Sequence, residues 1–190
     1  MTRFLRWTVI PMLLVGAIAA GATQATAATL PVCARDRDSG GETLCATVRP
    51  PNAWAKAAAY RATGYALPRP RTPSVLAPLA LRSITVTKPN RVDEGECGTQ
   101  AIVEARYAGG GQTLTYSYTE TDCGGLRGGT PVRVPGASVA IAQREGPRQV
   151  VEWTRSPRAD LDNGYMVGQM MLSSSTLSRD RLLAIAASIR

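Results

Sequence analysis

The sequence predicts an α+β protein in which an antiparallel β-sheet carries one N-terminal helix and one C-terminal helix. Segments of alternating apolar and polar side chains recur between residues 83 and 172, with Gly- or Pro-containing turns between them, which is typical of an antiparallel sheet. An alanine-rich stretch precedes these segments and an amphipathic stretch follows them, and both have the composition or spacing of helices.

Residues 1–27 have the pattern of a secretory signal peptide. Arg3 and Arg6 precede an apolar run over residues 7–22, and Ala-Thr-Ala at residues 25–27 supplies a small-x-small cleavage pattern. We therefore expect cleavage before Ala28 and a single secreted or extracytoplasmic domain at residues 28–190, located in the periplasm or cell wall.

The sequence disfavours two other fates of the N-terminus. A retained membrane anchor needs about 20 uninterrupted apolar residues, whereas this run is shorter and contains Pro11. Lipidation at Cys33 is disfavoured because Val32 is bulky beside the cut. We expect no transmembrane segment after signal cleavage.

The four cysteines are predicted to form two disulfides, because an even number of cysteines in an oxidising compartment favours bridges. A Cys33–Cys45 bridge closes a polar, turn-rich stretch as a small loop, and a Cys97–Cys123 bridge joins neighbouring strands. Four cysteines allow three pairings.

The segment after the first two cysteines is expected to be a helix followed by a connector. Asn52 is placed to cap a helix over residues 53–63, and Gly64 stands at its stop position. Residues 65–78 contain four prolines, which lack amide donors and resist both helix and central strand. We expect an extended connector over the surface or along a sheet edge.

Seven strands follow in the prediction, each an apolar or alternating run bounded by turn residues. They are expected at residues 83–87, 101–107, 113–119, 130–134, 138–143, 149–154 and 165–172.

The hairpin around residues 108–111 has two possible registers. A three-residue turn pairs Ala108 with Gln112 and brings Cys97 opposite Cys123. A four-residue turn pairs Val103 with Tyr116 and so gives a better shared apolar face. Both conditions hold if one residue bulges near the cysteines, at Gly98 or Gly124.

The chain is predicted to close with an amphipathic helix capped by Ser178. Its apolar stripe comprises Leu182, Ile185, Ala186 and Ile189, which recur at helical spacing and are expected to lie on the sheet.

About 40 C-terminal residues resemble a known bacterial envelope module. The residues that carry the resemblance are Gln149-Val-Val-Glu-Trp153, Tyr165-Met-Val-Gly-Gln-Met-Met-Leu172 and the helix at 177–189. They resemble the extracytoplasmic domain of some anti-sigma-factor proteins and lipoproteins, which is itself similar to the LolA and LppX lipoprotein carriers. The resemblance implies a curved sheet and a non-catalytic envelope domain, and it transfers no functional residue.

Charge and composition exclude several function classes. Removing Arg3 and Arg6 leaves 20 basic residues against 14 acidic ones, a net charge of +6, but the charges are scattered and do not favour nucleic-acid binding. The chain has no histidine, which removes Ser-His-Asp and Cys-His nucleophile systems and His-ligated zinc. We predict no catalytic residue, no metal site and no cofactor.

Aromatic side chains are the candidates for an apolar ligand groove on a curved sheet. The wider set includes Trp54, Tyr60 and Tyr65. The candidate groove residues within or beside strands are Tyr116, Tyr118, Trp153 and Tyr165.

The function expected from the sequence is a secreted, non-catalytic binding or interaction module of the cell envelope, whose partner is an envelope protein or an apolar ligand. One alternative is a secreted carboxylate hydrolase using Glu104, Glu152, Asp160 and Asp162, because paired carboxylates can cleave glycosides. The other alternative is a disulfide-stapled protease inhibitor.

Overall fold

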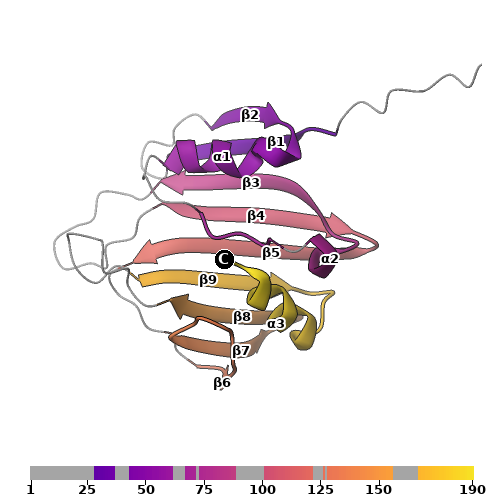
Figure 1. Ribbon diagram of the computed structural model, residues 1–190, viewed down its shortest axis with the longest axis vertical. Helices are drawn as coiled ribbons and strands as arrows, with labels where there is room; N and C mark the ends of the chain where they lie inside the picture. The colour runs from indigo at the N-terminus through magenta and orange to yellow at the C-terminus, as the bar shows by residue number, and fades with distance from the viewer. Residues whose placement is uncertain are drawn as a thin grey trace, which may run out of the picture.

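The computed structural model describes residues 28–36, 43–61, 67–71, 73–88, 101–121, 126, 128–155 and 167–190 (Figure 1). The predicted signal peptide lies outside these residues. Within the described ranges, no helix is both long enough and apolar enough to span a membrane.

One nine-stranded sheet organises the chain, in the order β2-β1-β3-β4-β5-β9-β8-β7-β6 (Figure 1). Its strands are β1 (Leu30–Asp36), β2 (Leu44–Val48), β3 (Ala80–Lys88), β4 (Ile102–Gly109), β5 (Gln112–Thr121), β6 (Thr130–Pro131), β7 (Val139–Glu145), β8 (Arg148–Arg155) and β9 (Val167–Ser174). The predicted α+β class is confirmed. The sheet is mixed, however, because β1 runs parallel to β3 while the other pairs are antiparallel.

Strands β1 and β2 were not predicted from the sequence, which indicated only a turn-rich stretch closed by Cys33 and Cys45. Leu30, Val32 and Ala34 are buried and alternate with more exposed neighbours, which is the period of a strand with one buried face. Polar residues after Ala34 concealed this short alternation.

Three helices lie on one side of the sheet (Figure 1). Helix α1 (Pro50–Arg61) packs on β1 and β3, helix α3 (Arg179–Ser188) packs on β8 and β9, and the four-residue α2 (Pro73–Leu76) contacts α3. Helix α1 begins at Pro50, ahead of the predicted cap Asn52. Proline fits the first turn of a helix because the amide it lacks has no partner there.

Helix α3 confirms its sequence prediction. The Ser178 side chain accepts a hydrogen bond from the Arg181 N–H at 3.3 Å and so caps the first turn. The predicted apolar stripe is buried against the sheet: Leu182, Ile185, Ala186 and Ile189.

The β4–β5 hairpin has neither of the predicted registers. Its turn is the two residues Gly110 and Gly111, both with positive φ, so Gly109 pairs with Gln112 and Val103 pairs with Tyr118. The shared apolar face was anticipated correctly, because a shift of two residues keeps every side chain on its own face. The predicted bulge at Gly98 or Gly124 lies outside the described residues.

Residues 67–71 form an extended segment between α1 and α3, which we call the strap (Figure 1). The buried Tyr116 hydroxyl of β5 donates a hydrogen bond of 2.9 Å to the Pro68 carbonyl, and Pro70 forms an antiparallel bridge with Ile189. The strap therefore covers the middle of the sheet, which neither long helix reaches. It agrees with the extended connector expected over residues 65–78, but Pro73–Leu76 within that range forms helix α2, so the expectation of no helix there was wrong.

Candidate ligand-binding groove on the helix side of the sheet

A groove of about 630 Å³ opens between α1, the strap, α2 and the sheet. This volume lies within the range of small-molecule sites, about 300–1,000 Å³. Its apolar surface comes from segments that are distant in the sequence: Trp54 of α1, Leu76 of α2, Leu79 and Leu81 at the start of β3, and Tyr107 of β4. We call this cavity the strap groove.

The core beneath positions the two aromatic residues of the strap groove. Trp54 lies on the buried side of α1, and its ring centroid is 6.1 Å from that of Tyr116. Tyr107 pairs with Leu81 across β3 and β4. Burial raises the pKa of the Tyr107 hydroxyl well above its usual range, which the nearby charge of Arg69 partly opposes, so the hydroxyl stays neutral.

Three prolines complete the wall of the strap groove: Pro50, Pro51 and Pro70. Their rings are rigid and apolar, and none has an amide N–H that would need a partner in the cavity. The first turn of α1 and the strap therefore present an apolar border.

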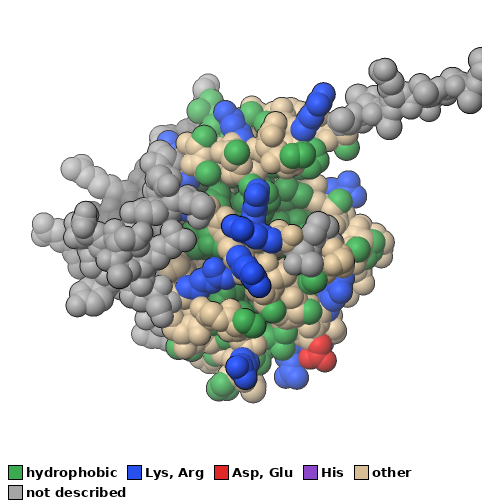
Figure 2. All heavy atoms as spheres, in the orientation of Figure 1, with side chains coloured by type: hydrophobic (Ala, Val, Ile, Leu, Met, Phe, Trp, Pro, Cys, Tyr) green, Lys and Arg blue, Asp and Glu red, His purple; other side chains and the backbone are tan. Residues whose placement is uncertain are grey.

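The strap also places cations at the groove. Arg69 and Arg71 both line it and both are exposed. Successive residues of an extended chain point to opposite sides, so the two arginines share the side of the strap opposite Pro70. Figure 2 shows basic side chains gathered over the middle of this face, and among the residues coloured by type the acidic side chain in view lies at its lower right edge.

A second hollow of about 410 Å³ adjoins the strap on the α3 side, and we call it the shelf. Its lining residues are Arg71, Val75, Ala184, Ala187, Ser188 and Arg190. Because Arg71 lines both cavities, the strap groove and the shelf meet at this residue.

The groove residues predicted from the sequence lie mainly in the core. Tyr116 and Trp153 have no exposed surface, and Tyr118 is buried with the Arg61 guanidinium 5.3 Å from its ring centroid. Tyr165 lies outside the described residues. Of the wider aromatic set, Trp54 lines the strap groove, whereas Tyr107 was missed because its strand pattern predicted only core packing.

Two carboxylates of the hydrolase alternative, Glu104 and Glu152, lie on the other side of the sheet. The strand pairing places Glu104, Ser117, Met171 and Glu152 in one row across four neighbouring strands. At about 4.8 Å per strand, the two glutamates are about 14 Å apart along the sheet, beyond the separation of about 5–9.5 Å in glycosidase pairs.

Each of these glutamates already has a partner. Glu104 forms a salt bridge of 2.8 Å with Arg106, and Glu152 accepts a hydrogen bond from the Gln169 amide beside a hollow of about 170 Å³. Asp160 and Asp162 lie outside the described residues.

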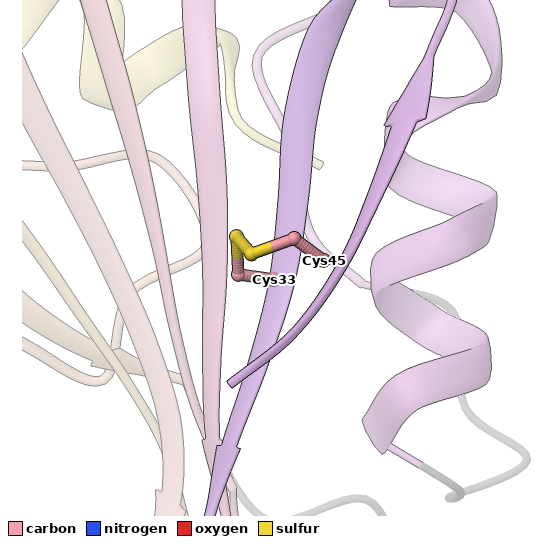
Figure 3. The surroundings of a disulfide bond; sticks show 2 residues. All are labelled: Cys33 and Cys45. Atoms are coloured by element: carbon pink, nitrogen blue, oxygen red, sulfur yellow. A yellow bond between two sulfur atoms is a disulfide. The ribbon is translucent and has the colours of Figure 1, made fainter. Parts of the chain in front are cut away.

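The predicted Cys33–Cys45 disulfide is present and links β1 to β2 (Figure 3). The two cysteines are direct cross-strand partners with Cα atoms 4.1 Å apart. The bridge lies on the side of these strands away from α1, as the inward direction of Val32 and Ala34 requires. Cys97 and Cys123 lie outside the described residues.

Comparison with known proteins adds no relative: no protein-family model, curated protein or solved structure matches this chain.

Proposed function

We propose that this chain is a non-catalytic binding protein of the bacterial cell envelope and that it holds the apolar chain of a ligand in the strap groove. The observation that carries the proposal is the groove itself, an open cavity bordered by leucines, aromatic rings and prolines. Leu76 and Leu81 are half-buried and keep apolar surface open to water, which favours an occupant that removes it from water.

The shape of the site supports a chain-like ligand. The strap groove is bounded by two helices, the strap and the sheet, so it can surround a narrow apolar group on several sides. An extracytoplasmic location agrees with the Cys33–Cys45 disulfide, because such bridges persist in oxidising compartments.

The two alternatives draw less support from the described residues. The hydrolase needs two carboxyl groups close together in a cleft, and Glu104 and Glu152 are separated by two intervening strands. The inhibitor needs a rigid exposed loop beside a disulfide, and residues 37–42 between Cys33 and Cys45 lie outside the described ranges.

Calorimetric titration with lauroyl monoacylglycerol, a neutral single-chain amphiphile, tests the proposal. The ligand is kept below its critical micelle concentration. We expect saturable binding with one ligand per protein. In Leu81→Trp the added indole should occupy the groove and weaken binding at least tenfold. Val139→Trp is the matched control, because Val139 is also a strand residue, is 52% exposed and lies away from the groove.

A second variant tests the same cavity if Leu81→Trp does not fold. Leu76→Trp narrows the same cavity from the half-buried face of α2. Absence of binding to the unaltered protein, or equal binding by the groove variants and the Val139→Trp control, would contradict the proposed function.

A further inference from the structure

We infer that the ligand of the strap groove carries an anionic headgroup, a phosphate or a carboxylate, which binds to Arg69, Arg71 and Arg190. The inference rests on the proposed function, because it gives the chemical class of the molecule whose chain fills the groove. That class is an anionic amphiphile.

Backbone pairing gathers these three arginines. The Arg69 N–H donates to the Arg190 carbonyl at 3.2 Å, the Arg190 N–H donates back to the Arg69 carbonyl at 3.3 Å, and the Arg71 N–H donates to the Ser188 carbonyl at 3.3 Å. Arg69 is thus directly opposite Arg190, and the bridge at Pro70 and Ile189 fills the position between the two hydrogen-bonded pairs. Pro70 and Ile189 face inward, so the arginine side chains share the outward side.

Like charges placed directly opposite each other destabilise a strand pair. The structure nevertheless sets Arg69 across from Arg190 and puts Arg71 two residues along the same side. Ion pairs between described residues join Arg106 to Glu104 and Arg179 to Asp180, and neither pair includes a strap arginine. No described acidic side chain lines the strap groove or the shelf. An anionic headgroup is complementary to this cluster of positive charges.

The two neighbouring cavities suggest an orientation for such a molecule. In this orientation its chain contacts Trp54, Leu79 and Leu81 in the strap groove, and its headgroup lies at Arg71, the residue that lines both cavities. Arginine suits this position because its planar guanidinium binds phosphate or carboxylate through two parallel hydrogen bonds. The arrangement separates the apolar part of the ligand from the charged part over the width of the strap.

The test compares two ligands with the same lauroyl chain, the neutral monoacylglycerol and the anionic lysophosphatidylglycerol. The unaltered protein should bind the anionic ligand at least tenfold more tightly, as expected for charge-assisted hydrogen bonds at a partly exposed site. The double variant Arg69→Gln, Arg71→Gln should lose that preference and bind the two ligands with equal affinity. Arg148→Gln is the matched control, since Arg148 is exposed and lines neither cavity.

The outcomes separate this inference from the proposed function. Equal binding of both ligands by the unaltered protein would overturn the anionic headgroup and leave the groove as an apolar site. Binding of neither ligand would contradict the proposed function. Inorganic phosphate at millimolar concentration should not displace the anionic ligand. If phosphate displaced it as effectively as lysophosphatidylglycerol does, the site would be a simple anion site, and the inference of an amphiphilic ligand would be overturned.

Discussion

Tyr116 is the residue that joins the core to the strap. Its ring is fully buried against Trp54, and its hydroxyl reaches the Pro68 carbonyl. Burial raises the pKa of this hydroxyl well above its usual range, so it remains a neutral donor. The side chain that sequence analysis placed in a groove thus supports the groove from beneath by fixing the strap.

Tyr116→Phe should lower the free energy of unfolding by about 1 kcal/mol, because it removes one hydrogen bond and leaves the Pro68 carbonyl without that partner. The Arg69 and Arg71 amides should also exchange hydrogen faster. Chemical denaturation and hydrogen exchange measure the two effects. Tyr60→Phe is the control, since Tyr60 is half-buried at the surface of α1 beside Lys56. Unchanged exchange at the strap would contradict this role.

A disulfide and a close backbone contact hold the elements around the groove. The disulfide ties β2, an edge strand, to β1, and β1 in turn supports α1. At the other wall, the end of β4 packs closely on the turn after α2, because a side chain at Gly109 would come within 2.2 Å of the Pro78 carbonyl oxygen. These contacts set the distance between the groove walls.

Replacing both Cys33 and Cys45 with alanine should lower the free energy of unfolding by about 2–4 kcal/mol. The bridge spans a sequence separation of 12 residues, and opening it enlarges the conformational freedom of the unfolded chain. Denaturant unfolding with and without reductant measures the effect, and reductant should not change the variant's unfolding free energy further. A loss below about 0.5 kcal/mol would contradict the expected contribution.

Gly109→Ala should lower the free energy of unfolding by about 3 kcal/mol, since backbone atoms rather than a flexible side chain obstruct the new methyl group. Gly111→Ala is the matched control in the same hairpin. Its positive φ strains a side chain by about 1 kcal/mol, but nothing lies within 4 Å of the added carbon. Thermal or denaturant unfolding compares the two, and equal losses would show that the Pro78 contact is unimportant.

At the scale of the whole molecule, the strength of the periodic pattern in each segment decided which elements could be predicted from the sequence. The alternating segments of β5, β8 and β9 and the stripe of α3 carry strong periodic signals, and their positions were predicted within a few residues. Strands β1 and β2 carry short, polar-flanked signals and were missed. The parallel pairing of β1 with β3 depends on a long connection through β2, α1 and the strap, which periodicity cannot reveal.

The strap groove was also beyond prediction from sequence, for a related reason. Its walls come from α1, the strap, α2 and the start of β3, and β4 adds Tyr107. No single segment has a pattern that distinguishes a groove wall from a core face. In the sequence, Arg69 and Arg71 are two among many scattered charges. In the structure, the pairing of the strap with residues 188–190 places them beside Arg190.

The salt dependence of affinity should distinguish the contribution of the arginines from that of the apolar groove. Arg69, Arg71 and Arg190 are exposed, so salt screens their attraction to an anionic headgroup. The Debye length falls from about 10 Å at 0.1 M to about 3 Å at 1 M ionic strength. Lysophosphatidylglycerol affinity should fall several-fold between these concentrations, and monoacylglycerol affinity should not fall. Calorimetry at both ionic strengths measures this, and a parallel loss for both ligands would contradict the division of the site.

The most direct test of the central claim, that the strap groove binds an apolar chain, is a methyl NMR titration of the intact protein with lauroyl monoacylglycerol. The Leu76, Leu79 and Leu81 methyl signals should shift together and saturate with one dissociation constant, while those of the exposed Leu44 and Val139 stay unchanged. Absent shifts, or shifts at Leu44 and Val139 as large as those in the groove, would contradict it.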